Sequence, residues 1–417
     1  MKRSIYWYKV DNAGKIFPAV SKDSRSSVFR LSFYLKEEII PELLEQAVNE
    51  TLPRFESFAV QLKAGMFWYY LAANTRPVQI EKESPIICRF FHWTKNNGYL
   101  FKVYYFKNKI TLETFHSLSD GTGAMEFLKA ITQNYLKLCG HEFSYSGKVK
   151  SELPSSPRET VDMFVNQYDK GSKMNLKEEV AYHVKGEKFA DYFTLCVNAK
   201  VPTEQLLAHT RRLGVTVGVY ITAVLAYSIY TQRPDCKTTK CPIKIFIPTN
   251  LRKFFPSDTL RNFSLYIKAT FDGRKEWTFE QMLAETKRQF DAQLVKEELH
   301  ARMNSNVWIE KNLAIRLLPL FLKNIAFKIG YKRLADDIST CYISNLGKVT
   351  LPNDMNDFVE DVEFAIGGFG IAVTSIHGHT NIMLNTDFKD ISILQYFINH
   401  FIQEGLLVTV DTNYLEA

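Results

Sequence analysis

Residues 114–123 read TFHSLSDGTG and place His116 and Asp120 in HxxxDG spacing. Upstream, residues 99–106 and 109–115 alternate between apolar and polar side chains around a short turn that contains an asparagine. This alternation predicts a β-hairpin whose second strand ends at the histidine. A strand end holds an imidazole rigidly, and the loop that follows leaves one face of the ring open to a substrate.

A helix is predicted downstream of this loop. Apolar residues recur at helical spacing from 124 to 138, and three side chains could cap the helix: Ser119, Asp120 and Thr122. Glycines at 121 and 123 would let other parts of the backbone approach closely. We interpret the stretch as an active-site loop; the alternative is a structural histidine followed by a capped turn.

Length and composition indicate an ordered globular protein. A chain of 417 residues exceeds the size at which one core keeps growing, so two domains or two similar halves are expected. Apolar residues make up 46% and aromatic residues 14% of the chain, which favours a protein rich in β-structure.

The charge is mildly basic and carries little functional information. The net charge is +7, with 52 Lys and Arg scattered among 45 Asp and Glu, and there is no nucleic-acid motif. A diffuse positive field suits an anionic ligand or a membrane surface, and it is equally compatible with ordinary solubility charge.

The six cysteines are widely spaced, without CxxC pairs, and read as reduced core thiols. There is no apolar segment of signal-peptide type near residue 1 and no run of 18 apolar residues, so a cytoplasmic protein is expected. His377 and His379 could begin a metal site, but no further ligands are apparent and a turn is preferred; we predict no metal.

The pattern of elements occurs twice along the chain. The first half begins with a strand at 27–35 and a helix at 36–52, and it ends with the hairpin and helix around the HxxxDG loop. After a stretch rich in Ser, Gly and Pro, a strand at 192–199 and helices at 202–213 and 217–230 begin the second half.

Further elements follow in the second half. A buried strand at 241–248 leads into a proline-containing loop with Arg252 and Arg261, and a charged helix is predicted over 278–303. Residues 311–334 are cationic and amphipathic and are interrupted at a proline. This segment could lie on a membrane surface, although packing against the body of the protein is the preferred interpretation.

Four stretches resemble the CoA-dependent acyltransferase superfamily, which includes chloramphenicol acetyltransferase, non-ribosomal peptide condensation domains, plant acyl-CoA transferases and alcohol acetyltransferases. They are HSLSDG (116–121), the strand-helix-strand segment at 26–58, the start of the second half at 193–230, and NLRKFFPSDTLRNF (250–263). SNLG at 344–347 is similar to the alcohol acetyltransferase branch.

The resemblance implies an α/β fold of two chloramphenicol acetyltransferase-like subdomains, each a two-layer sandwich, that meet along a central tunnel. It places the N-terminal subdomain at 1–140, a linker at 141–190 and the C-terminal subdomain at 191–417. Donor thioester and acceptor would enter the tunnel from opposite ends.

The resemblance also implies roles for individual residues. His116, with a pKa near neutrality, would be the general base that takes a proton from the acceptor. Asp120 would hold the loop by pairing with Arg252, and Gly121 would leave room for the ligand. The oxyanion could be stabilised by Ser344, by Asn345 or by backbone amides near them, and the sequence does not decide among these donors.

The sequence departs from the family pattern in three places. Phe115 stands where condensation domains and chloramphenicol acetyltransferase carry a second histidine, which favours the alcohol acetyltransferase branch. The DFGWG motif of the plant enzymes is absent, and Arg261 replaces a glycine before Asn262.

The expected activity is transfer of an acyl group from acyl-CoA, as a co-substrate, to a hydroxyl or amine of a small or lipid-like acceptor. The protein would be a monomer without a permanent cofactor and would have at most peripheral membrane contact. The alternatives are a condensation-type transferase whose donor sits on an acidic carrier protein, and a non-catalytic binding protein that retained the fold.

Overall fold

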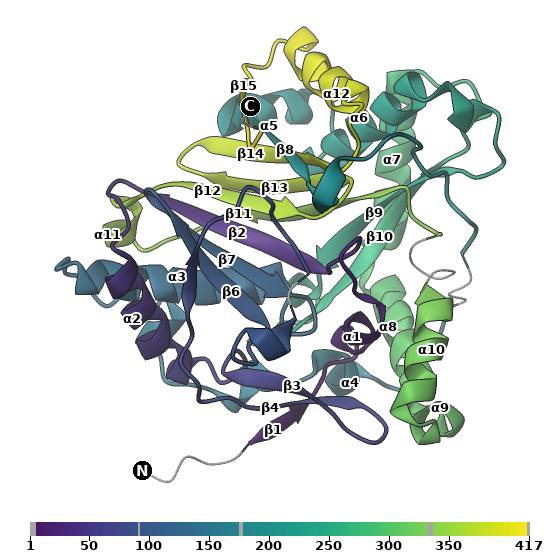
Figure 1. Cartoon of the computed structure of the whole chain (residues 1–417). Helices are drawn as coiled ribbons and strands as arrows, with labels where there is room; N and C mark the ends of the chain where they lie inside the picture. Colours follow the sequence, from purple (N-terminus) through teal and green to yellow (C-terminus); the bar gives the residue numbers. More distant parts are fainter. Residues whose placement is uncertain (1–5, 91, 175–177, 332–336, 415–417) are drawn as a thin grey trace.

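A five-stranded sheet in the order β12-β2-β7-β6-β5 forms the centre of the first half of the molecule in the computed structural model, which describes residues 6–90, 92–174, 178–331 and 337–414 (Figure 1). Its strands are β2 (Val28–Leu35), β5 (Ile80–Lys82), β6 (Phe101–Phe106), β7 (Lys109–Phe115) and β12 (Val359–Ile366). The predicted hairpin is formed by β6 and β7, and its turn places Lys107 at a positive φ of 50°.

Two helices cover this sheet. Helix α2 (Pro41–Thr51) begins at a proline, whose missing N–H costs nothing in the first turn, and α3 (Gly121–Leu138) follows the HxxxDG loop. Aromatic rings fill the space between helices and sheet, where Phe127 of α3 packs against Phe58 with ring centroids 4.4 Å apart. A smaller sheet extends this half through β1 (Trp7–Lys9), β4 (Tyr69–Ala73) and β3 (Val60–Ala64).

The segment between the halves contains short elements, among them α4 (Met163–Gln167). Its buried Glu159 accepts two hydrogen bonds from the Arg54 guanidinium, at 2.8 and 2.9 Å. The backbone carbonyl of Glu159 accepts a hydrogen bond from the Leu260 amide, so this segment contacts both halves.

The second half is built on a seven-stranded mixed sheet in the order β10-β9-β11-β13-β14-β8-β15. The strands are β8 (Leu195–Pro202), β9 (Ile243–Asn250), β10 (Ser264–Phe271), β11 (Cys341–Lys348), β13 (Gly370–Ile376), β14 (His379–Thr386) and β15 (Thr409–Thr412). The helices beside it are α5 (Thr203–Arg212), α6 (Val217–Gln232), α7 (Phe279–Gln293) and α12 (Ser392–Gln403). His377 lies in the tight turn between β13 and β14, and His379 is the first residue of β14.

The molecule therefore has two subdomains, each with its own hydrophobic core, and they interlock. Strand β12 comes from the second half of the sequence but pairs antiparallel with β2, with Phe364 opposite Leu31. Short helix α11 (Asn353–Asn356) precedes it. The boundaries at residues 140 and 190 stay a prediction.

The single helix predicted at 278–303 is wrong. Helix α7 ends at Gln293, and α8 (Lys296–Lys311) begins after Val295, whose backbone is extended. The Gln293 side chain bonds both the N–H and the C=O of Lys268 on the edge strand β10, so the end of α7 is fixed to the sheet and the chain turns away. No local breaker residue signals this turn.

The remaining helices are α1 (Phe17–Val20), α9 (Leu313–Leu317) and α10 (Leu320–Tyr331), with the predicted interruption at Pro319. The last part of the predicted segment, 332–334, lies outside the described residues. Within the described ranges no single helix is long and apolar enough to cross a membrane. The pair α5 and α6, bent by 81° relative to each other, is long and apolar enough when the two helices are taken together, by length and composition only.

Candidate active site

His116 lies immediately after β7, at the junction of strand and helix that the sequence predicts. Its backbone N–H donates to the Ser27 carbonyl at 3.0 Å, which extends the pairing of β7 with β2 by one residue. The imidazole is partly buried between two aromatic rings: Phe17 of α1 stacks on it at 5.2 Å, and Phe29 of β2 lies at 4.6 Å.

Burial of the His116 ring lowers its pKa from 6.5 to about 4, although the nearby Asp120 carboxylate acts in the opposite direction. This pKa is lower than the near-neutral value expected for a general base of this kind. The imidazole is therefore neutral at pH 7 and free to accept a proton.

Of the three predicted candidates for the N-cap of α3, which were Ser119, Asp120 and Thr122, the structure shows Asp120 as the cap. One carboxylate oxygen accepts from the Gly123 N–H at 3.1 Å, and the other accepts from the Arg252 guanidinium and the Phe263 N–H, both at 2.8 Å. The carboxylate is thus buried in a set of hydrogen bonds that fixes the loop.

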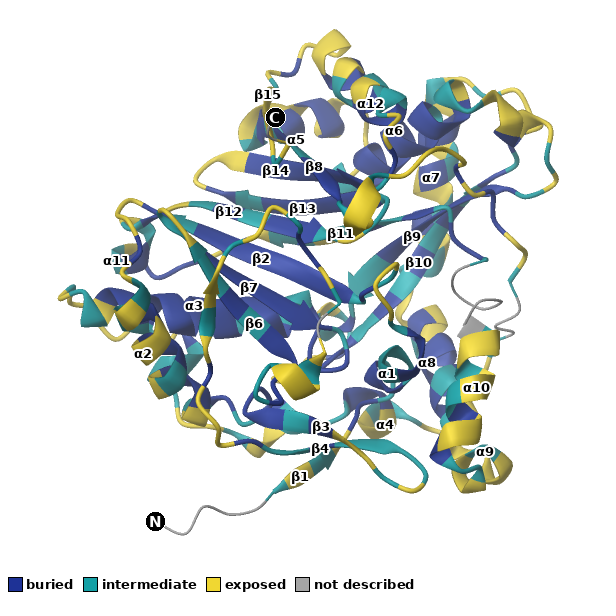
Figure 2. Ribbon diagram, in the orientation of Figure 1, coloured by how far each residue is buried: buried dark blue, intermediate teal, exposed yellow. Residues whose placement is uncertain are grey.

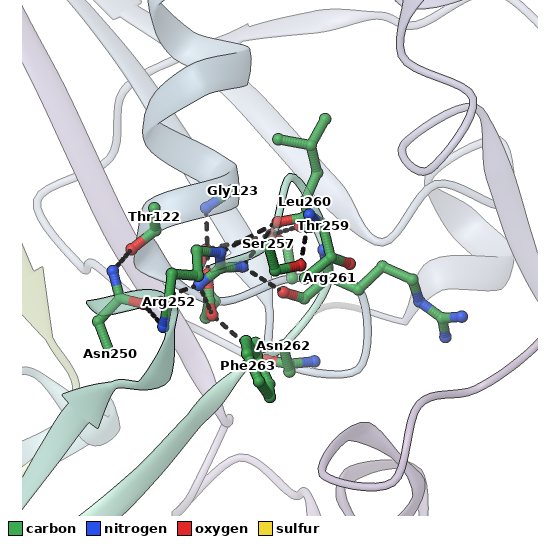
Figure 3. A network of polar contacts seen from close by, with 12 residues as sticks. Thr122, Gly123, Asn250, Arg252, Ser257, Thr259, Leu260, Arg261, Asn262 and Phe263 are labelled. Carbon is green, nitrogen blue, oxygen red and sulfur yellow. Dashed lines mark hydrogen bonds and ion pairs between the residues drawn. The ribbon is translucent and has the colours of Figure 1, made fainter. Parts of the chain in front are cut away.

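Arg252 comes from the second half of the chain, in the short helical turn after β9. Besides Asp120, its guanidinium donates to the carbonyls of Thr259 at 2.9 Å and of Arg261 at 2.7 Å (Figure 3). The ion pair and these bonds join the HxxxDG loop to residues 259–263, so the two halves of the molecule meet here.

The two glycines of the loop permit close packing. A Cβ on Gly123 would lie 2.1 Å from the Leu260 carbonyl oxygen, which no side chain tolerates. A Cβ on Gly121 would lie 2.8 Å from the Leu346 side chain, so this glycine makes room for Leu346 in addition to any ligand. SNLG therefore packs against the first turn of α3.

Ser344 and Asn345 lie in β11, where the register shifts between Asn345 and Gly347. The exposed Asn345 side chain accepts a hydrogen bond from the Gly347 N–H at 2.8 Å, and Ser344 is partly buried opposite Ala372 of β13. Among the described residues, no hydrogen bond joins either side chain to His116, and their role as oxyanion donors stays a prediction.

A buried set of hydrogen bonds behind His116 was not predicted from the sequence. Asn262 donates from its side-chain amide to the His116 carbonyl at 2.8 Å and to the Asp11 carboxylate at 3.1 Å. Asp11 is fully buried, its carboxylate also accepts from the Gly14 N–H at 2.7 Å, and burial raises its pKa to about 6. The order Asp-x-x-Gly at 11–14 is the one local signal for this turn.

Arg261, which stands where the resemblance implies a glycine, connects the N-terminal segment to the loop at 259–263. Its side chain is buried and donates to the carbonyls of Lys9 at 2.6 Å and Thr160 at 3.2 Å, and its Nε lies 3.5 Å from the Asp11 carboxylate. The N-terminal segment is thereby tied to the loop that carries Asn262.

The described part of the chain contains no group of three or more His, Cys, Asp or Glu side chains that could hold a metal ion. In the turn between β13 and β14, the His377 Nε2–H donates to the Val359 carbonyl at 2.7 Å.

No family model and no curated protein matches the chain. Solved structures do match over nearly the whole length. TRI101 of F. graminearum, complexed with coenzyme A and T-2 mycotoxin, is 10% identical, with a TM-score of 0.63 over 98% of this chain and 100% of that one. Polyketide synthase associated protein 5 from Mycobacterium tuberculosis is 12% identical, with a TM-score of 0.58 over 94% and 96%.

The condensation domain of the Monacolin K polyketide synthase MokA is also similar, at 10% identity and a TM-score of 0.56 over 96% of this chain and 97% of that one. At these identities the comparisons show a shared architecture. The chain has the two-subdomain fold of these solved structures, as the resemblance of its sequence motifs implies.

Proposed function

We propose that the protein transfers an acyl group from acyl-CoA to a hydroxyl or amine acceptor, with His116 as general base. The observation that carries this proposal is a neutral imidazole at the end of β7, with its backbone held by Ser27 and Asn262 and its loop held by the Asp120–Arg252 ion pair. An imidazole whose backbone is held rigidly in this way is suited to take a proton from an incoming nucleophile.

In the proposed reaction the acyl group passes directly from CoA to the acceptor, without an acyl-enzyme intermediate. The imidazole takes the proton of the acceptor O–H or N–H while that atom attacks the thioester carbonyl carbon. The tetrahedral intermediate then expels the CoA thiolate, and the imidazolium returns the proton to sulfur. A low pKa of His116 weakens it as a base but makes its protonated form a strong acid for the second step.

Asp120 and Arg252 act as positioning residues in this proposal. The Asp120 carboxylate receives three donors, so its part is to hold the loop and not to accept the acceptor's proton. Ser344 or Asn345, on the strand beside α3, would supply a donor to the oxyanion.

Related structures support an acyl-CoA donor and a hydroxyl-bearing acceptor. TRI101 was solved with coenzyme A and T-2 mycotoxin or deoxynivalenol, and a starter condensation domain was solved with C8-CoA and Leu-SNAC. Since both halves of the site come from one chain, we propose that a monomer is active.

The first test is calorimetry of the purified protein with CoA and acetyl-CoA, because it needs no knowledge of the acceptor. A Kd on the order of micromolar to millimolar is expected. Absence of heat with both ligands would contradict the acyl-CoA donor and favour a carrier-protein donor or a binding role.

The second test follows thiol release in a screen of alcohols and amines. His116→Ala should lower the rate by at least about a hundredfold while leaving CoA binding intact. His379→Ala, at an exposed turn, is the matched control and should behave as wild type. Equal activity of the His116 variant would refute the general-base role.

A further inference from the structure

Helices α9 and α10 both expose large apolar side chains to solvent. The side chains recur every four residues, and each is more than half exposed: Leu313 67%, Leu317 60%, Phe321 65%, Ile325 54% and Ile329 59%. We call these five residues the α9–α10 face. Figure 2 shows the exposed residues on α9 and α10 at the edge of the molecule. A surface of this kind on a globular protein indicates an interaction site.

Hydrogen bonds on one side of α10 fix the orientation of the helix, so the side chains on its opposite side point outward. The buried Lys323 donates to the carbonyls of Phe67 at 2.8 Å and Arg316 at 3.0 Å. Asn324 donates to the Tyr69 hydroxyl at 3.0 Å. Lys323 and Asn324 therefore face the body of the protein, together with the buried Leu320 and with Phe327, whose ring lies 6.3 Å from that of Trp68. Phe321, Ile325 and Ile329 of the same helix face water, on the side where an ordinary surface helix carries polar residues.

The neighbouring hairpin between β3 and β4 extends the surface. The Leu320 N–H donates to the Met66 carbonyl at 2.9 Å, which holds the hairpin beside the start of α10. Met66 itself is 75% exposed. An apolar side chain on a second element thus stands at the border of the α9–α10 face.

The charges at this surface have one sign. Lys311, Arg316 and Lys328 are exposed, and the sequence has no Asp or Glu between residues 311 and 331. The preceding acid, Glu310, is paired with Lys15. An apolar face bordered by cations matches the boundary between acyl chains and anionic headgroups.

We propose that the α9–α10 face docks on a membrane that contains anionic lipids, with the two helices lying in the plane of the interface. A two-fold dimer through the same face is disfavoured because it would bring Arg316 and Lys328 of both copies together. The apolar side chains would enter the headgroup and acyl boundary while the cations contact lipid phosphates and carboxylates.

The proposed surface is connected to the candidate site. Helix α10 packs against α1, and Phe17 of α1 stacks on the His116 ring. Docking would therefore bring the site close to the bilayer. The membrane proposal does not depend on acyl transfer, and its test uses no activity measurement.

The test is flotation of the full chain with two kinds of vesicle, phosphatidylcholine alone and phosphatidylcholine with about one third phosphatidylserine. The wild type should float with the anionic vesicles and much less with the neutral ones. The double substitution Phe321→Glu with Ile325→Glu should abolish flotation. The control pair Leu407→Glu with Val410→Glu, exposed on another part of the molecule, should leave it unchanged.

The cations provide an independent variant set. Arg316→Gln and Lys328→Gln should each weaken binding to the anionic vesicles about fivefold, and added salt should do the same. Unchanged melting temperatures would show that these exposed substitutions leave the fold intact.

Three results would overturn the proposal. They are wild-type protein that floats with neither vesicle, flotation unaffected by the Phe321 and Ile325 substitutions, and a wild-type dimer in sedimentation that the same substitutions convert to monomer without any vesicle binding. The last result would assign the face to self-association.

Discussion

His116 and Asp120 are four residues apart, yet their surroundings give them opposite properties. Burial among aromatic rings disfavours the charged form of His116, whereas the Asp120 carboxylate accepts hydrogen bonds from an arginine and two backbone N–H groups. In the proposed reaction His116 exchanges a proton with the substrate, while Asp120 holds the loop in place.

The pH dependence of activity should report the His116 environment. Because burial lowers its pKa to about 4, kcat/KM should stay level as pH falls through 6.5 and should drop only near pH 4. Phe17→Leu should open the ring to water and move the drop toward 6.5. A wild-type inflection at 6.5 would contradict the burial argument.

The lowered pKa of His116 also makes the free energy of unfolding depend on pH. The folded pKa of His116 lies below the unfolded value, so its contribution is complete above pH 6.5 and is lost as pH falls toward 4. His116→Gln should flatten that part of the curve of unfolding free energy against pH, measured by urea denaturation.

Asp120→Ala should destabilise the fold because it leaves the Arg252 guanidinium buried without its carboxylate. The side chains are 7% and 12% exposed, and a loss of about 3–5 kcal/mol in unfolding free energy is expected. Lys188→Ala removes an ion pair whose lysine is 59% exposed and should cost at most about 1 kcal/mol. Equal losses in urea denaturation would contradict a structural role for the Asp120 pair.

At the scale of elements, the site depends on how α3 meets the loop at 259–263 and strand β11. The Ser119 hydroxyl donates to the Leu260 carbonyl at 2.5 Å, and the Asn250 side chain at the end of β9 donates to the Thr122 hydroxyl at 3.1 Å. The first turn of α3 is thus held from the second half of the chain, and its approach distance is set by Gly123.

Gly123→Ala should separate these elements because the new methyl group would overlap the Leu260 carbonyl. We expect a loss of about 1–3 kcal/mol in unfolding free energy and a marked loss of activity. Gly121→Ala is the matched control: its methyl group meets the flexible Leu346 side chain, so the cost should stay below about 1 kcal/mol. Similar thermal denaturation of both variants would argue against close backbone packing at Gly123.

At the scale of the whole molecule, the two subdomains are not independent. Strand β12 completes the sheet of the first half, and Cys196 of β8 belongs to the hydrophobic core of that half. The ion pairs Asp120–Arg252 and Asp11–Arg261 also cross between the halves. The site exists only where both parts are assembled.

A fragment of residues 1–190 should therefore fail to fold alone. Without β12, the apolar strand β2 becomes an exposed edge, which favours aggregation. Co-expression with residues 191–417 should restore soluble, folded protein, as judged by gel filtration and circular dichroism. A soluble fragment of 1–190 with cooperative unfolding would contradict this interlocking.

The local elements and the HxxxDG motif could be predicted from the amino-acid sequence. Alternation and helical spacing located β2, the β6–β7 hairpin and α3, and the resemblance of NLR at 250–252 supplied the partner of Asp120. These features depend on near neighbours along the chain or on a motif of fixed spacing, so one sequence is enough to predict them.

Other features of the site depend on contacts between residues that are far apart in the sequence. Asp11 and Asn262 are 251 positions apart, the break after α7 depends on a contact with β10, and the low pKa of His116 depends on which rings bury it. The outward direction of the apolar face of α10 follows from contacts on its other side. Each of these properties depends on groups brought together by folding, which periodicity along the chain does not encode.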